Sequence, residues 1–151
     1  PHLQFLHCPQ DGLAVGRSRW GRKSERGEHL CPIGSGHRLR PDAAAAFLAL
    51  DAAYKEETGS HICVTDSYRT LDQQVDLKQR KPRLAARPGT SNHGWGTALD
   101  LSCGAQSFDG AAHRWLVENA ADYGWHNPGW ARPNGSKPEP WHWEYEPSLL
   151  D

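Results

Sequence analysis

Two histidines and two carboxylates in the last sixty residues have the spacing of a catalytic metal site. His93 is followed by Asp100 in a glycine-rich stretch, and His142 is preceded three residues earlier by Glu139. Catalytic zinc commonly binds two imidazoles and one carboxylate and keeps a fourth position open. We therefore expect His93, Asp100 and His142 to bind one Zn²⁺ per chain. Glu139 is then the expected general base toward the attacking water.

Each of these residues also has an ordinary interpretation. His93 could be a loop histidine, Asp100 a strand-end carboxylate paired with an arginine, and Glu139 a surface glutamate in a proline-rich loop. One short pattern has a real risk of a chance match, whereas several such motifs in one chain are far more specific. The combination therefore favours the metal site.

The residues around the first two ligands predict how they converge. The glycines after His93 permit a sharp turn or a close approach of the backbone. Alternation over residues 97–102 predicts a strand with Leu99 and Leu101 on one face and Asp100 on the other. Asp100 is thus expected to point away from the core and toward the site.

A second strand is predicted over residues 141–145, where aromatic residues alternate with His142 and Glu144. The aromatic side chains share one face of this strand, and His142 and Glu144 share the other. Pro140 stands directly before it, at a position where a strand tolerates proline. Residues 125–138 are rich in glycine, proline and asparagine and are expected to form an active-site loop.

The remaining pattern predicts helices over residues 41–58, 71–79 and 109–123 and a strand over residues 62–65. Pro41 suits the first turn of a helix, and Gly59 and Gly124 suit C-terminal caps. On the helix at 71–79, Leu71, Val75 and Leu77 are expected to form the buried face.

These elements amount to an α+β fold, in which helices pack on a small, mostly antiparallel sheet whose other face carries the metal. The length of 151 residues suits a single domain. Apolar residues in segment 1–40 show no sustained period. We expect this segment to be irregular and packed on a catalytic domain formed by residues 41–151.

The four cysteines include no close pair of the kind that binds zinc through thiolates. Their even number suits two disulfides in an oxidising compartment, and buried free thiols are the alternative. Of the three possible connectivities we favour Cys8–Cys31, within the irregular segment, and Cys63–Cys103, between two predicted strands.

Charge and hydropathy exclude several classes of partner. The net charge of −1 implies no polyanion such as nucleic acid, and no apolar run approaches the length that spans a membrane. The chain begins at Pro1 and contains no methionine, so we expect a processed product whose signal peptide lies outside this sequence. We expect a monomer that is secreted or held in the cell envelope.

The motifs together resemble the VanY-type zinc D-Ala-D-Ala carboxypeptidases, within a wider group that includes lysostaphin-like and hedgehog-like zinc domains. The resemblance rests on Ser91-x-His93-x-x-Gly96-x-Ala98-x-Asp100, on Glu139-Pro140-Trp141-His142, and on Ser67-Tyr68-Arg69-Thr70 followed by Gln73 and Gln74. These motifs extend from residue 67 to residue 145. Segment 1–40 has no recognisable counterpart.

The resemblance implies that Arg69 stabilises the oxyanion of the tetrahedral intermediate, as the matching arginine does in that family. A structural salt bridge with Asp66 or Asp72 is the alternative.

The resemblance also implies that Ser91 and Gln73 hold the backbone or the terminal carboxylate of the substrate, with Ser67 from the same motif. Ser91 could instead cap a turn. Trp141 is a candidate for lining a substrate groove, although packing is the ordinary role of a tryptophan.

The expected function is therefore that of a D,D-carboxypeptidase acting on peptidoglycan stem peptides that end in D-Ala-D-Ala. An endopeptidase that cuts inside the stem, for example between L-Ala and D-Glu, would share the zinc motif. A non-catalytic, zinc-stabilised cell-wall binding module is the alternative from another class. Glu139 and Arg69 argue against that module, because a structural metal site needs neither.

Overall fold

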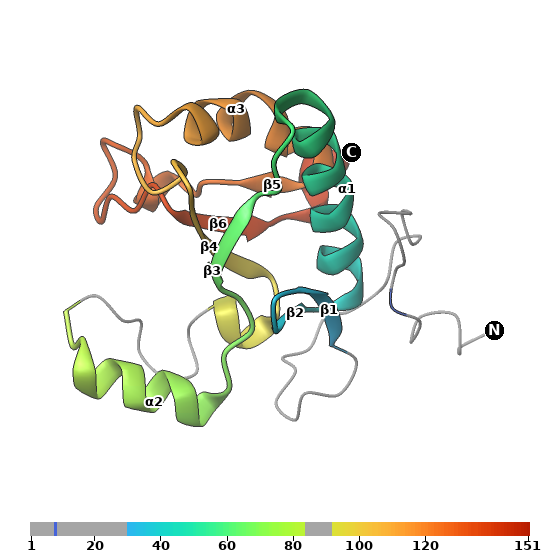
Figure 1. The fold of residues 1–151 in the computed structure, drawn as a ribbon. Helices are drawn as coiled ribbons and strands as arrows, with labels where there is room; N and C mark the ends of the chain where they lie inside the picture. The colour runs from blue at the N-terminus through green and yellow to red at the C-terminus, as the bar shows by residue number, and fades with distance from the viewer. Residues whose placement is uncertain (1–7, 9–29, 84–91) are drawn as a thin grey trace.

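The computed structural model describes residue Cys8 and residues 30–83 and 92–151 (Figure 1). Its strands are β1 (Cys31–Gly34), β2 (His37–Leu39), β3 (Cys63–Asp66), β4 (Ala98–Ser102), β5 (Trp125–His126) and β6 (His142–Tyr145). Its α-helices are α1 (Pro41–Thr58), α2 (Leu71–Arg80) and α3 (Ala111–Asn119). Short 3₁₀ helices are η2 (Asn92–Trp95), η3 (Ala120–Tyr123), η4 (Gly129–Ala131) and η5 (Pro147–Leu150). The predicted α+β class is confirmed.

The main sheet has the strand order β3-β4-β6-β5, and all of its neighbouring strands are antiparallel. Strand β4 is central, with β3 on one side and β6 on the other. Asp100 of β4 stands directly opposite His142 of β6. Residues opposite each other in an antiparallel pair point to the same face, so this register brings two predicted ligands together.

The other face of the sheet is covered by α1 and α3 (Figure 1). Leu99 and Leu101 of β4 pack there with residues of both helices and of the neighbouring strands, as the alternation predicted. The largest contributors from outside β4 are Phe47, Leu50, Leu116, Trp125 and Trp143. Burying one large apolar side chain stabilises a fold by roughly 1.5–3 kcal/mol, so this core anchors β4 firmly.

Helix α1 begins and ends at the predicted residues. Arg40 precedes the helix and holds the carboxylate of Asp42 with two hydrogen bonds of 2.7 Å. Gly59 ends it in a left-handed conformation (φ 81°), and its N–H donates to the carbonyl of Lys55 at 2.8 Å. Of the helices in the described ranges, none is both long and apolar enough to cross a bilayer.

Helix α3 is shorter than the range 109–123. It starts at Ala111, after Gly110, and its last turn tightens into the 3₁₀ helix η3 before the left-handed Gly124 (φ 81°). Ala120 is fully buried, and η3 lies beside α1. The helix was therefore predicted correctly, but its start and its last turn differ from the prediction.

Residues 31–39 form a β-hairpin where an irregular segment was expected. Cys31 pairs with Leu39, and both side chains are fully buried. Gly34, Ser35 and Gly36 all have positive φ and make the turn. The strands are too short for an alternating pattern to show, although the Gly-Ser-Gly turn was visible in the sequence. The rest of segment 1–40, apart from Cys8 and Leu30, lies outside the described residues.

Two further local predictions are wrong. Val75 of α2 is 38 % exposed, because α2 lies apart from the sheet and is not packed into the core (Figure 1). Trp125, expected at the start of a loop, is buried in the two-residue strand β5. A lone valine among charged residues does not require burial, and a two-residue strand has no readable period.

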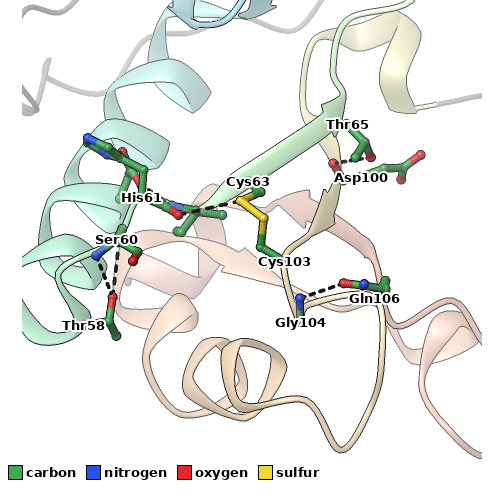
Figure 2. Close-up of a disulfide and its surroundings, with 11 residues drawn as sticks. Thr58, Ser60, His61, Cys63, Thr65, Asp100, Cys103, Gly104 and Gln106 are labelled. Carbon is green, nitrogen blue, oxygen red and sulfur yellow. Dashed lines mark hydrogen bonds and ion pairs between the residues drawn. A yellow bond between two sulfur atoms is a disulfide. The ribbon is translucent and has the colours of Figure 1, made fainter.

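Both predicted disulfides are confirmed. Cys8 bonds to Cys31 at the start of the hairpin, and Cys63 bonds to Cys103. Figure 2 shows the second bridge joining β3 to the residue that follows β4. It thus ties together, by a covalent bond, two neighbouring strands of the main sheet.

Replacing Cys63 and Cys103 with serine is expected to lower the free energy of unfolding by about 2–4 kcal/mol. The bond links residues 40 positions apart, and opening that loop enlarges the unfolded ensemble. Urea denaturation of the oxidised proteins measures the difference. The matched control is the double serine variant at Cys8 and Cys31, which opens a separation of 23 residues. An unchanged unfolding midpoint for the first variant would contradict the prediction.

Candidate metal centre and active site

His93 is buried on η2, immediately before β4. Its Nδ1 donates to the backbone carbonyl of Ser67 at 2.8 Å, since a carbonyl oxygen can only accept. In the neutral imidazole this bond leaves the Nε2 lone pair available for a metal. That Nε2 lies 3.3 Å from Oδ1 of Asp100.

The turn between these two residues depends on Gly96. Its φ is +70°, and a Cβ atom at this position would lie 2.9 Å from the backbone nitrogen of Arg40. The carbonyl of Gly96 accepts a hydrogen bond from that same nitrogen at 2.9 Å. A larger residue would push η2 away from Arg40, so glycine here lets His93 and Asp100 converge.

His142 opens β6 and is also buried. Its Nε2 lies 2.9 Å from Oε1 of Glu144, and its Nδ1 lies 3.2 Å from Oδ1 of Asp100. A proton on Nε2 shared with the carboxylate of Glu144 leaves Nδ1 as the ligand atom. Each imidazole is therefore oriented by a hydrogen bond from its far nitrogen, while its near nitrogen faces Asp100.

The structure thus brings all three predicted ligands together. The donor atoms of His93, Asp100 and His142 lie within 4.8 Å of one another, close enough to hold one metal ion. Two neutral imidazoles and one carboxylate are a donor set that suits a borderline ion such as zinc. The chemistry of the side chains therefore fits the predicted metal.

Electrostatics within the cluster are strong. Burial alone would raise the pKa of Asp100, but hydrogen bonds from His142 and His93 outweigh it and hold that pKa well below its usual range. Burial would lower the pKa of His142, yet its bonds to Asp100 and Glu144 raise the pKa to about 9. A metal ion must therefore displace protons to bind here.

Glu139 lies in the turn before β6 and is buried. Burial raises the pKa of its carboxyl group, and the nearby charges on His142 and Lys137 oppose that shift. Asp100 and His93 also act on this carboxyl group electrostatically, which places it within reach of the cluster's field. The Nζ of Lys137 lies 3.7 Å from Oε1 of Glu139.

Arg69 is buried beside the cluster. Its backbone N–H donates to the carbonyl of His93 at 3.1 Å, and its Nε and Nη2 reach Oδ2 of Asp66 at 3.1 and 2.8 Å. Asp66 is the partner of Asp100 in the sheet, next to an irregularity in the register of β3. The salt bridge offered as an alternative therefore exists, and it fixes the guanidinium near the site.

Ser67 has structural contacts that its sequence motif did not indicate. Its backbone carbonyl accepts from His93, and its Oγ accepts from the N–H of Arg38 at 3.1 Å. The same Oγ lies 3.1 Å from Nδ1 of His37, to which it can donate. The β1–β2 hairpin is thereby bonded through Ser67 to a predicted metal ligand.

Gln73, Trp141 and Ser91 are the other predicted substrate residues. Gln73 accepts from the N–H of Thr70 through Oε1 at 2.9 Å, and together they form the capping box of α2. Trp141 is half-buried directly before β6. The prediction for Ser91 lies outside the described residues.

A polar cavity of about 480 Å³ lies between the hairpin, the end of β3 and α2. Three of the predicted functional residues line it together, namely Ser67, Arg69 and Gln73. Asp66 and Arg38 contribute further charged groups to its wall. The cavity therefore lies between residues 67–70, which follow β3, and helix α2.

Three residues of the site had no predicted catalytic or metal-binding role. Glu144 orients His142, and alternation had already placed both on one face. Trp130 is 39 % exposed, and its ring centre lies 5.0 Å from that of His142. Asn127 donates to the backbone of Glu139 and His142. A side chain that bonds only to distant backbone atoms leaves no spacing signal in a sequence.

Two known proteins are similar in sequence to this chain. A D-alanyl-D-alanine carboxypeptidase of Enterococcus faecalis (strain ATCC 700802 / V583) is 28 % identical, over 58 % of this chain and 41 % of that protein. The candidate carboxypeptidase YodJ of Bacillus subtilis (strain 168) is 35 % identical, over 57 % of this chain and 37 % of that protein. The matched part thus spans about two fifths of the length of these relatives.

Solved structures share the fold. VanYB in complex with D-alanine-D-alanine has a TM-score of 0.63 and 23 % identity, covering 93 % of this chain and 86 % of its own. A variant of the vancomycin-resistance D,D-pentapeptidase VanY in complex with Zn(II) has a TM-score of 0.62 and 23 % identity, covering 94 % and 88 %. The LdcB LD-carboxypeptidase has a TM-score of 0.62 and 22 % identity, covering 83 % and 70 %.

The family comparison covers most of the chain. The model described as VanY, D-alanyl-D-alanine carboxypeptidase, matches residues 36–148. This range includes strand β2, residues 67–70 and every proposed metal ligand. The chain therefore belongs to the VanY family of D-alanyl-D-alanine carboxypeptidases.

Proposed function

We propose that this chain is a zinc-dependent D,D-carboxypeptidase that removes the terminal D-Ala from peptidoglycan stem peptides outside the cytoplasm. The observation that carries the proposal is the convergence of His93, Asp100 and His142, whose donor atoms lie within 4.8 Å of one another. The Zn(II) complex of VanY and the D-alanine-D-alanine complex of VanYB support the choice of metal and substrate.

The proposal assigns one part of the reaction to each group. Zinc held by the three ligands would supply a Lewis acid and lower the pKa of a water. Glu139 takes a proton from the water as the water's oxygen bonds to the carbonyl carbon of the scissile amide. It then returns that proton to the amide nitrogen as the carbon–nitrogen bond breaks and D-Ala leaves as a free amine.

Arg69 stabilises the negative charge that develops on the carbonyl oxygen. Asp66 holds its guanidinium and the carbonyl of His93 holds its backbone, so little reorganisation is needed during the reaction. The cavity lined by Ser67, Arg69 and Gln73 is the proposed end of the substrate groove, where polar donors would meet the terminal carboxylate.

The proposed substrate has a free terminal carboxylate, and this feature separates a carboxypeptidase from an endopeptidase. A stem pentapeptide ending in D-Ala-D-Ala is expected to lose one residue. The same peptide amidated at its C-terminus is expected to react roughly 10- to 100-fold more slowly, because a charged hydrogen bond contributes about 1.5–3 kcal/mol. Mass spectrometry of the digests measures both rates.

The other outcomes decide between the alternatives. Equal cleavage of the two peptides, or a break between L-Ala and D-Glu, would assign the chain to the endopeptidases. Faster cleavage of a stem tetrapeptide than of the pentapeptide would indicate L,D-carboxypeptidase activity. Zinc binding without cleavage of any peptide would indicate a binding module.

A further inference from the structure

Asn127 connects the two residues on which the proposed mechanism depends most. It follows β5 directly and is only 5 % exposed. The Nδ2 of its side-chain amide donates to the backbone carbonyl of Glu139 at 3.0 Å and to that of His142 at 2.8 Å. Both hydrogens of one NH₂ group are thus used on the proposed base and on a proposed ligand.

These two carbonyls mark the ends of a single turn. The N–H of His142 donates to the carbonyl of Glu139 at 3.1 Å, which closes residues 139–142 into a compact unit. Inside it, the carbonyl of Pro140 accepts from Nδ1 of His113 and from Nε1 of Trp143, each at 3.1 Å. The conformation of this turn determines how far the carboxylate of Glu139 lies from the imidazole of His142.

Further hydrogen bonds hold the backbone of Asn127 and the turn at residues 139–142. The backbone carbonyl of Asn127 accepts from Nε of Arg132 at 2.8 Å. The start of the turn is held as well, because the N–H of Glu139 donates to the carbonyl of Ala131 at 2.8 Å. Asn127 is therefore held at its own backbone while its side chain holds the turn.

We propose that Asn127 is a positioning residue, which sets the separation between the proposed base Glu139 and the proposed ligand His142. The inference rests on the proposed function. Asn127 acts only through backbone atoms of the turn. Without its amide, the buried carbonyl of His142 loses this donor and the carbonyl of Glu139 keeps the N–H of His142, so the turn can shift. Displacements near 1 Å can cost about 10²-fold in rate, and groups that orient metal ligands typically matter by about 10- to 100-fold.

The test compares Asn127→Ala with Asn119→Ala. Asn119 is the matched control, because its Nδ2 also donates to a backbone carbonyl, that of Trp115 at 2.9 Å, but at the end of α3. For each variant, zinc affinity is measured by competition with a chromogenic chelator, and kcat and KM are measured on the D-Ala-D-Ala pentapeptide.

Asn127→Ala is expected to lower kcat and to weaken zinc binding, each by roughly 10- to 100-fold, with little change in KM. Asn119→Ala is expected to change neither. Asn127→Ser serves as a second variant, because its hydroxyl, with a water in the vacated volume, can still donate to the turn. It is expected to fold and to lie between wild type and Asn127→Ala.

Wild-type kcat and zinc affinity in both Asn127 variants would overturn the inference. Equal losses in Asn127→Ala and Asn119→Ala would also overturn it, because the effect would then follow general stability. A wild-type chain that binds no zinc would instead overturn the proposed function itself, so the two failures are distinguishable.

Discussion

Replacing Glu139 with glutamine is expected to lower kcat by a factor of roughly 10² to 10⁴, the usual size of a general acid–base contribution. Glutamine has the same shape, but it can neither take a proton from the attacking water nor return it to the leaving amine. Zinc content and the free energy of unfolding should stay near those of the wild type, because Glu139 is not among the three ligands. Steady-state kinetics on the stem pentapeptide measure the effect.

The control for this variant is Glu146→Gln. The side chain of Glu146 is 53 % exposed just after β6, and its Oε2 lies 3.9 Å from Nε2 of His126. Its amide variant should therefore react at the wild-type rate. Near-normal turnover in Glu139→Gln would remove Glu139 from the mechanism and leave the metal assignment untouched.

Replacing His142 with alanine is expected to reduce bound zinc from about one equivalent to near zero and to abolish cleavage. A catalytic zinc held by three protein ligands does not keep its affinity when one imidazole is lost. Elemental analysis after mild dialysis measures the metal. Circular dichroism checks that β6 still folds, because the ring of His142 also packs beside those of Trp130 and His93.

His126→Ala is the matched control for metal loss. His126 lies on the neighbouring strand β5 and pairs with Glu144, yet it is not part of the ligand cluster. The His126→Ala variant should therefore retain the metal. Full zinc content in His142→Ala would show that the ion is bound elsewhere and would refute the ligand assignment.

The face on which each strand ligand lies could be predicted, because it depends on the local alternation of side chains along the strand. Alternation alone placed Leu99 and Leu101 toward the core and Asp100 toward the opposite face. The same rule placed His142 and Glu144 together on β6. The sheet register then needed only to set Asp100 opposite His142, and burial of the apolar face strongly constrains such a register.

The hydrogen bonds that hold the cluster in place could not be predicted, because they join residues far apart in the sequence. Asn127 and Ser67 act on backbone atoms far away in the sequence, so no spacing connects them to the ligands. The hairpin at 31–39 has strands too short for a period. Val75 was misplaced because α2 lies apart from the sheet, and the pattern of a helix does not say whether it packs on the core.

The placement of β4 has a consequence for how the molecule opens. Asp100 lies in the middle strand, between ladders to β3 and β6, so exposing it by local fluctuation means breaking both ladders at once. Such an event approaches global unfolding, whereas α2 lies apart from the sheet and is expected to open at a much smaller free energy. Under the proposed function, substitutions along α2 are therefore expected to alter which peptides bind in the adjoining cavity, while the ligand cluster on β4 stays intact. On that proposal, substrate range and catalytic competence can change separately.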